Sequence, residues 1–344
     1  MMITRIRAVY TAGLVAFLSL GSNCAWTQGT SHSVAPATST RSGRAFPEKP
    51  IRMLIPFAPG GNTDILARAI GSRMSDNWGK PVVIDNRPGG NGFIATGVVQ
   101  KATPDGHTLL VGSTGELSIN PSLFKTLPYN VERDFAPVSL GTISPLLIAA
   151  HSSFAPKTIK ELIALAKAKP KALSYASVGL GSPMHLSGEL FNMISGTDIV
   201  HVPYKGGGPA TIALLGGQEV QFGFVGMGPA IPHVKAGRIK ALAISTARRA
   251  TLLPEVPTMQ EAGVKNFDTS IWFAFLVPAK TPGSVIARLN AELNRVLKLP
   301  EVRDFLINTG VEVAPTTPDE LARFMKSEAE KYRKIIEVSG TKAD

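Results

Sequence analysis

Residues 51–66 read IRMLIPFAPGGNTDIL, and this stretch contains the pattern that decides the fold. Residues 51–57 form a short apolar run that predicts a buried strand, and residues 64–78 repeat apolar side chains at the spacing of a helix. Two glycines lie between them. Glycines let backbone N–H groups approach a ligand closely, and the start of a helix adds the positive end of its dipole. This corner therefore suits an anion.

The same order of strand and helix continues toward the C-terminus. Apolar or β-branched runs predict further strands at residues 81–85, 108–112, 173–177, 199–204, 220–225, 241–245 and 271–277. Three later helices begin with local start signals, namely Thr158-x-x-Glu161, Ser182-Pro183 and Thr317-Pro318-Asp319-Glu320. Alternating strands and helices predict an α/β fold in which helices cover both faces of parallel sheets.

Composition narrows the class of protein. The 344 residues are enough for two domains, and 44% hydrophobic with 18% charged residues supports a sizeable core. Cys24 is the single cysteine, which excludes an internal disulfide framework and a cysteine-based metal centre. The formal net charge is +11, which favours anionic partners. Basic residues are spread out with no basic–aromatic ladder, so we expect no nucleic-acid partner.

The N-terminus has the layout of a secretory signal. Arg5 and Arg7 precede an apolar run at residues 8–20, which is too short to span a membrane comfortably. We predict a signal peptide at residues 1–25, with its cleavage site and lipidation at Cys24 left open. Residues 26–45 are rich in Ser and Thr and predict a flexible tether. The mature protein should therefore be exported to the periplasm.

Two more glycine-rich corners follow predicted strands. One is Pro203-Tyr204-Lys205-Gly206-Gly207-Gly208, and the other is Val178-Gly179-Leu180-Gly181-Ser182-Pro183. Open α/β sheets bind ligands at the carboxyl ends of their strands. A tight turn alone also explains any one of these glycine runs. Three such corners together favour a cleft that binds an anion.

Enzyme motifs are largely missing. The sequence has no G-x-x-x-x-G-K-[ST], no G-x-S-x-G, no H-E-x-x-H and no pair of histidines at a metal-ligand spacing, so we expect no metal and no cofactor. His185, in the first turn of its helix, is a candidate donor to an anion. Asp64 either caps its helix, which is the preferred interpretation, or accepts a hydrogen bond from a ligand amine or hydroxyl. An exported hydrolase that uses His185 with Asp64 or a serine remains an alternative to a binding protein.

Eight segments together resemble the receptors of the tripartite tricarboxylate transporters, the TctC or Bug family. The resemblance runs from about Phe46 to the C-terminus, through FPEKPIRMLIPFAPGGNTDILAR, GKPVVIDNRPGGNG, TPDGHTLLVGSTG, INPSLFKTLPYNVERDFAPVSL, LSYASVGLGSPMHLSGELF, IVHVPYKGGGPA, IPHVKAGRIKALAIST and LPEVPTMQEAG. It implies a periplasmic-binding-protein-like fold (type II), with two α/β lobes joined by crossing strands and a ligand cleft between them. Lobe 1 is expected at residues 46–151 plus 270–344, and lobe 2 at residues 152–269.

The resemblance also implies the site. A small carboxylate would be held largely by main-chain groups of two loops, with further residues lining the two walls. The implied ligand-binding residues are Phe57, Ala58, Pro59, Gly60, Gly61, Asn62, Thr63, Asp64, Ser113, Thr114, Ser177, Gly179, Gly181, Ser182, Pro183, His185, Tyr204, Lys205, Gly206 and Gly226. Family members often carry an Asp-Asn pair where this chain has Val225-Gly226, and this departure favours a less polar or aromatic acid.

The resemblance further implies a receptor without enzymatic activity. It would deliver its solute to a membrane permease and work as a monomer. A sensory binding protein that feeds a signalling partner would have the same cleft, so the sequence leaves this alternative open. Citrate-like acids, dicarboxylates, aromatic acids and nicotinate-like acids all remain candidate ligands.

Overall fold

The computed structural model describes residues 46–343. The predicted signal peptide, the tether and Cys24 lie outside the described residues. The strands are β1 (Ile51–Ile55), β2 (Val82–Asn86), β3 (Thr108–Ser113), β4 (Phe135–His151), β5 (Ser174–Ser177), β6 (Val200–Pro203), β7 (Phe222–Gly226), β8 (Ile239–Ile244), β9 (Ser270–Pro278) and β10 (Glu312–Val313).

Helices follow most of these strands. They are α1 (Asn62–Trp78), α2 (Phe93–Gln100), α3 (Asn120–Leu123), α4 (Val131–Asp134), α5 (Ile159–Ala168), α6 (Pro183–Ser195), α7 (Gly207–Gly216), α8 (Met227–Lys235), α9 (Gly283–Leu297), α10 (Pro300–Asn308) and α11 (Pro318–Ser339). A short 3-10 turn at Gly90–Gly92 precedes α2, and a π-helical turn at Gly115–Ile119 follows β3. The sequence did not predict α8, α10 or the π-helical turn.

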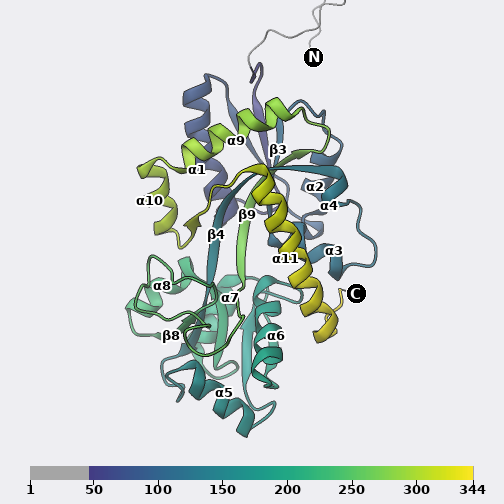
Figure 1. The fold of residues 1–344 in the computed structure, drawn as a ribbon. Helices are drawn as coiled ribbons and strands as arrows, with labels where there is room; N and C mark the ends of the chain where they lie inside the picture. Colours follow the sequence, from purple (N-terminus) through teal and green to yellow (C-terminus); the bar gives the residue numbers. More distant parts are fainter. Residues whose placement is uncertain (1–45, 344) are drawn as a thin grey trace, which may run out of the picture. The chain divides into compact units, whose positions relative to one another are not determined.

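One strand joins the two halves of the sheet. The order is β2-β1-β3-β9-β4-β7-β5-β6, and β8 and β10 also pair with β4. The first part of the 17-residue β4 pairs with β9, and its last part pairs with β7 and β8 (Figure 1). We call the part built on β1, β2, β3 and β10 lobe 1, and the part built on β5 to β8 lobe 2. The predicted α/β class with crossing strands is confirmed.

Alternation along the strands builds the two faces of lobe 1. Successive side chains of a strand point to opposite faces of the sheet. In β9, Phe273 and Phe275 pack with α1, α9 and α10, whereas Trp272 and Ala274 pack with α2 and the start of α11. Both sets are buried, so both faces of this half-sheet are covered. This pattern fits a continuous apolar strand such as residues 271–277.

Lobe 2 repeats the arrangement on a smaller scale. In β4, Leu146, Ile148 and Ala150 pack against α5 and α6, and the alternate residues Leu147 and Ala149 pack against α8 and the segment after β8. Figure 1 shows these helices around the lower strands. The lobe therefore has its own core, and its strand ends are held in fixed positions.

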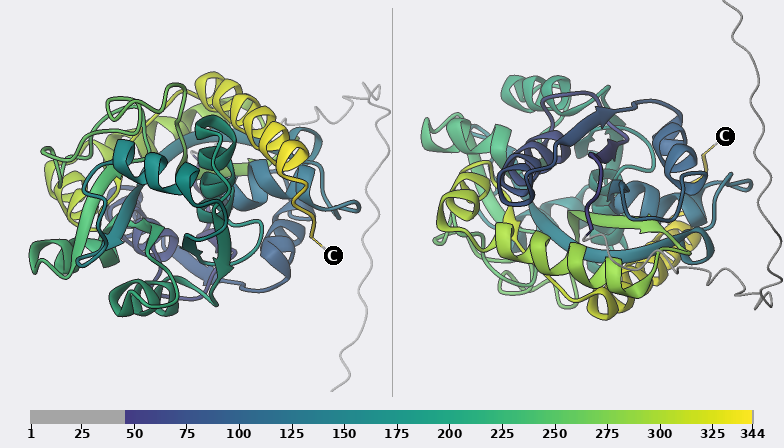
Figure 2. Two further views of the ribbon diagram at one scale, coloured as in Figure 1. Left: turned by 90° about the horizontal axis from the view of Figure 1, so that it is seen from below. Right: turned by 90° about the horizontal axis from the view of Figure 1, so that it is seen from above.

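The last helix contributes to both cores. Leu321 and Met325, in the first half of α11, belong to the core of lobe 1. Tyr332, Ile335 and Ile336, in its second half, pack with residues of α5 and α6 in lobe 2. In Figure 2 the helix, drawn in yellow, lies along the outer side of the strands. A single amphipathic helix thus spans the junction of the lobes.

Candidate functional site

The directions of the strands make two sheet edges face each other. β3 is antiparallel to β9, β9 to β4, and β4 to β7. β4 runs from lobe 1 into lobe 2, so β3 and its parallel neighbour β1 end toward lobe 2. By the same reasoning β7 and its parallel neighbour β5, which in turn pairs in parallel with β6, end toward lobe 1. The glycine-rich corners predicted from the sequence all lie at these two edges.

The strand register gives the separation of the edges. Ser113, the last residue of β3, pairs with Phe273, and Gly226, the last residue of β7, pairs with Leu146. Phe273 lies three residues after the start of β9, and β9 starts beside the residue that precedes Leu146. About four residues of extended chain therefore separate the two strand ends, which is about 13 Å along the strands.

The corner between β1 and α1 leaves backbone donors unpaired. Gly61 is the N-cap residue of α1, and within residues 46–343 no side chain accepts a hydrogen bond from the amides of the first turn. The first amides of a helix have no partner within the helix. Gly60 and Gly61 have open space where a Cβ would stand, and the φ of Gly60 is +90°. Phe57, Ala58 and Pro59 precede them and are exposed.

Asp64 stabilises this corner but does not cap the helix. The helix begins at Asn62, so the sequence-based preference for Asp64 as the N-cap is wrong. Its carboxylate Oδ2 instead accepts hydrogen bonds from the Gly60 N–H (3.0 Å) and from Nε of Arg68 (2.9 Å). The Arg68 guanidinium lowers the pKa of the Asp64 carboxyl below its ordinary value. Asn62 and the buried Thr63 complete the first turn.

Ser113 and Thr114 lie at the end of β3, but their hydroxyls are engaged within lobe 1. Ser113 donates to Oε2 of Glu116 (2.6 Å), and Oγ1 of Thr114 accepts from the Trp272 N–H (2.8 Å). Glu116 is buried in the π-helical turn, and burial raises the pKa of its carboxyl. These two side chains therefore fix the wall of lobe 1 through internal bonds.

The corner between β5 and α6 is capped and tightly packed. Oγ of Ser182 accepts from the His185 N–H and donates to the Gly179 carbonyl (2.6 Å), so Ser182 is the predicted N-cap, followed by Pro183. The Gly179 N–H donates to Oγ of Ser177 (3.1 Å). Gly179 and Gly181 both have positive φ. The side chains of this loop therefore mostly hold the loop itself.

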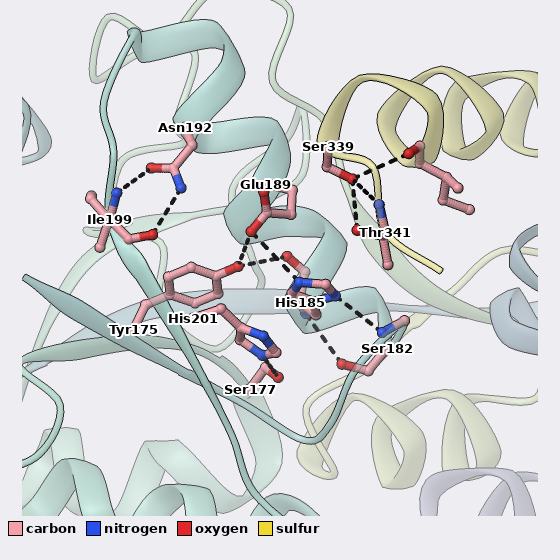
Figure 3. A network of polar contacts seen from close by, with 12 residues as sticks. Tyr175, Ser177, Ser182, His185, Glu189, Asn192, Ile199, His201, Ser339 and Thr341 are labelled. Atoms are coloured by element: carbon pink, nitrogen blue, oxygen red, sulfur yellow. Dashed lines mark hydrogen bonds and ion pairs between the residues drawn. The ribbon is translucent and has the colours of Figure 1, made fainter. Parts of the chain in front are cut away.

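His185 does not offer a free donor at the loop surface. Its side chain is buried, and its Nδ1 accepts a hydrogen bond from the Gly181 N–H (3.0 Å). Its Nε2 lies 3.6 Å from Oε1 of Glu189. Figure 3 shows this imidazole between the loop and the carboxylate. The expectation that His185 donates to the ligand is not supported by these contacts.

Three residues around His185 were missed by the sequence reasoning. The Tyr175 hydroxyl donates to Oε1 of Glu189 (2.7 Å), and the His201 ring stacks on the His185 ring with centroids 3.9 Å apart. Nε2 of His201 lies 2.6 Å from Oγ of Ser177. Burial lowers the pKa of His201 to about 4. The i, i+4 spacing of His185 and Glu189 was the one signal that pointed to this network.

The corners at β6 and β7 hold the remaining predicted residues. Gly206 is the N-cap of α7, with φ of +103° and no side-chain cap. Tyr204 donates to Oε2 of Glu219 (2.8 Å), and burial, together with that carboxylate, raises the pKa of the phenol to about 12. Lys205 is exposed. Gly226 is the N-cap of α8, again without a side-chain cap.

A cavity of about 740 Å³ lies elsewhere, in lobe 1. Residues of α4, of the segment before it and of α11 line it, including Tyr129, Arg133, Arg323 and Lys326. None of the predicted site residues lines this cavity. The facing strand ends, and not this cavity, match the residues that the sequence singled out.

Two findings concern what the described residues lack. In residues 46–343, no group of three or more His, Cys, Asp or Glu side chains is placed to hold a metal ion. Over the same range, no helix has the length and apolar character to cross a membrane.

The fold and the facing strand ends define a solute-binding protein of the periplasmic type. The chain belongs to the family described as the tripartite tricarboxylate transporter family receptor, whose sequence model matches residues 66–341. It is 36% identical over 302 residues to protein BugT of Bordetella pertussis, which covers 88% of this chain and 92% of that protein. The family predicted from the sequence is confirmed.

Two solved structures are similar along nearly their whole length. One is Rpa4515 from R. palustris with adipate, which is 33% identical to this chain with a TM-score of 0.76. The match covers 87% of this chain and 99% of that chain. The other is MatC from Rhodopseudomonas palustris with bound malate, at 35% identity and a TM-score of 0.71, covering 85% and 100%. Both relatives hold a dicarboxylate.

Proposed function

We propose that this chain binds a small organic carboxylate between its two lobes, outside the cytoplasm, and delivers it to a membrane permease as a monomer. One observation carries the proposal. The N-terminus of α1 has no side-chain cap and lies at the strand edge that faces lobe 2. An uncapped helix start binds anions through its amides and its dipole. The two relatives with bound dicarboxylates support the choice of ligand class.

Backbone donors explain recognition while Arg68 stays engaged with Asp64. A carboxylate would bond the first-turn amides of α1 from lobe 1 and the loop before α6 from lobe 2. Charge-assisted hydrogen bonds contribute about 1.5–3 kcal/mol each. Three or four of them, less the costs of desolvation and closure, fit a dissociation constant near 1 μM, which is about −8 kcal/mol.

Closure of the lobes follows from the same geometry. The ligand reaches both loops only when the two strand edges approach, so it stabilises the closed state by its additional contacts there. We assign residues 46–151 and 270–344 to lobe 1 and residues 152–269 to lobe 2, with the last residues of β4, from Leu146 on, crossing into the core of lobe 2. The second half of α11 packs on lobe 2, so this helix must shift or bend when the lobes move.

Calorimetric titration of residues 46–344 tests the proposal. The panel contains adipate, succinate, malate, citrate, benzoate and nicotinate, with glucose and glycine as controls. We expect saturable binding of at least one acid and no change in the proton spectrum of that acid after prolonged incubation. Absence of binding by every acid, after unfolding and refolding to remove a retained ligand, would refute the proposal, and so would conversion of an acid into a product.

The substitution Gly61→Val tests whether the carboxylate binds at the N-terminus of α1. Gly61 has φ of −81° and ψ of 169°, which valine adopts freely, and no atom lies within 4 Å of a Cβ at this position. The fold should survive, whereas the added methyl groups stand beside the helix amides. We expect at least about a tenfold loss of affinity for the acid that binds, the equivalent of one lost charge-assisted hydrogen bond. Gly97→Val in α2, also with open space, is the matched control.

A further inference from the structure

The loop before α6 has only one unpaired amide among four in a row. The Gly179 N–H is bound to Ser177, the Gly181 N–H to His185, and the Ser182 N–H to the Gly179 carbonyl. Among the described residues, none accepts a hydrogen bond from the Leu180 N–H. The Leu180 side chain is 56% exposed. The Leu180 amide is therefore the donor that this loop can present to a ligand.

The bond from Gly181 fixes the proton of His185. An imidazole nitrogen accepts a hydrogen bond only when it carries no proton. Nδ1 of His185 accepts from Gly181, so the proton of the neutral ring lies on Nε2. Nε2 faces the carboxylate of Glu189, one turn further along α6. The Glu189 carboxylate thus stabilises the tautomer that the loop requires.

The surroundings hold Glu189 and His185 in this arrangement. Burial opposes ionisation of Glu189, but the nearby His185 ring and the hydrogen bond from Tyr175 outweigh it, so the pKa of this carboxyl is lowered. The Tyr175 hydroxyl also lies 3.2 Å from the His185 carbonyl. The His201 ring stacks on the His185 ring. Figure 3 shows the four side chains gathered next to Ser182.

The loop also contacts lobe 1. A Cβ at Gly181 would lie 2.4 Å from Cδ2 of Leu123, at the end of α3. The φ of Gly181 is +71°, a backbone conformation that residues other than glycine rarely adopt. The position of Gly181 therefore depends on two partners, Leu123 across the junction and His185 within the lobe.

We propose that Glu189 and His185 are a positioning pair for the ligand loop. Glu189 keeps the proton of His185 on Nε2, Nδ1 then holds the Gly181 amide, and the loop presents the Leu180 amide to the carboxylate. Neither side chain touches the ligand. The effect on binding rests on the proposed function, whereas the effect on the loop stands independently of it.

Two substitutions at one position separate positioning from mere packing. His185→Asn keeps an oxygen acceptor near the place of Nδ1, and His185→Leu fills the space without any acceptor. Ser195→Ala, at the far end of α6, is the control for a general loss of helix stability. Glu189→Leu removes the carboxylate that faces Nε2, and Glu189→Gln retains an oxygen there.

Nuclear magnetic resonance gives a readout that needs no ligand. In the wild type, the ring nitrogens of His185 should show the tautomer with the proton on Nε2, and Glu189→Leu should shift this signature toward a mixture. His185→Leu should speed hydrogen exchange of the Gly181 amide at least about fivefold, the equivalent of one lost hydrogen bond, and His185→Asn should restore much of the protection. Equal exchange in His185→Leu and the wild type would overturn the proposal.

Adipate titration gives the second readout, and the tightest-binding acid of the panel replaces adipate if adipate does not bind. We expect His185→Leu to weaken binding about fivefold and His185→Asn to weaken it less, with Ser195→Ala unchanged. If the His185→Asn variant binds the acid as weakly as the His185→Leu variant, an acceptor near the place of Nδ1 is irrelevant and the proposal fails. If no acid binds the wild type, the proposed function fails, and the exchange rate of the Gly181 amide still decides whether the pair positions the loop.

Discussion

The two glycine loops that face each other are built in opposite ways. The loop before α1 has an uncapped helix start, and its glycines stand in open space. The loop before α6 has a serine cap, and its glycine amides are bound to Ser177 and His185. In the loop before α1, Asp64 takes the Gly60 amide, but the amides of the first helical turn have no side-chain acceptor among the described residues. In the loop before α6, side chains take most of the amides. The comparison teaches that a glycine-rich corner presents only those amides that no neighbouring side chain takes.

Alanine at the glycines with positive φ gives the largest expected difference between the loops. Gly60 and Gly181 both have positive φ, +90° and +71°, which costs alanine about 1–2 kcal/mol at either position. Only Gly181 would also place a Cβ against Leu123, and such overpacking adds about 1–3 kcal/mol. Gly181→Ala should therefore lower the free energy of unfolding, measured in urea, by about 1–3 kcal/mol more than Gly60→Ala. Leu123→Ala in the Gly181→Ala background should recover part of this loss, and equal costs at the two glycines would contradict the contrast.

Removing the cap of α6 and adding a cap to α1 should change the stability of the fold by smaller amounts and in opposite directions. Ser182→Ala removes the acceptor for the His185 N–H and should cost about 1 kcal/mol of stability. Gly61→Ser adds an acceptor at the uncapped start of α1 and should raise stability by a few tenths of a kcal/mol, about the difference between serine and glycine at this position. Thermal melting measures both changes. The added hydroxyl competes for the amides, so Gly61→Ser should also weaken carboxylate binding, and unchanged affinity would argue against α1 as the anion site.

The smallest expected effect is on the pH dependence of the free energy of unfolding, to which Asp64 in the first turn of α1 contributes. The pKa of Asp64 is lowered in the folded protein, chiefly by Arg68, from an ordinary value of 3.8. The unfolded chain therefore binds this proton first, so Asp64 stabilises the fold above pH 3.8, and this contribution is lost as the pH falls through the lowered pKa. Urea unfolding at pH 7 and pH 3 should show a smaller decline with acid in Asp64→Asn than in the wild type. Asp76→Asn, an exposed position on the same helix, should leave the decline unchanged.

Local signals in the sequence predicted the fold better than they predicted the contacts in the site. The caps at Thr158, Ser182 and Thr317 were predicted because they depend on residues that are adjacent or three positions apart, and the structure confirms all three. The long strand β4 was not predicted, because Pro137, Gly141 and Pro145 interrupt its apolar pattern. It forms because partners on both sides of the junction pair with it.

The site was predicted as a set of strand-end loops, but the roles of its side chains were not. His201 stacks on His185 because the parallel register places His201 beside Tyr175, which is a property of the folded sheet. The bond from Gly181 to His185 depends on the positive φ of that glycine, which the sequence permits but does not require. Trp272 lies in the core and donates to Glu328 (3.0 Å), a partner 56 residues away in sequence.

The contribution of α11 to both cores has a consequence during synthesis. Lobe 2 lacks the aromatic ring of Tyr332, and lobe 1 lacks Leu321 and Met325, until the last helix has left the ribosome. The chain from the end of β9 to the end of α11 takes about 3 to 12 s to translate at about 5–20 residues per second. Over that interval both halves lack core side chains that only the final segment supplies.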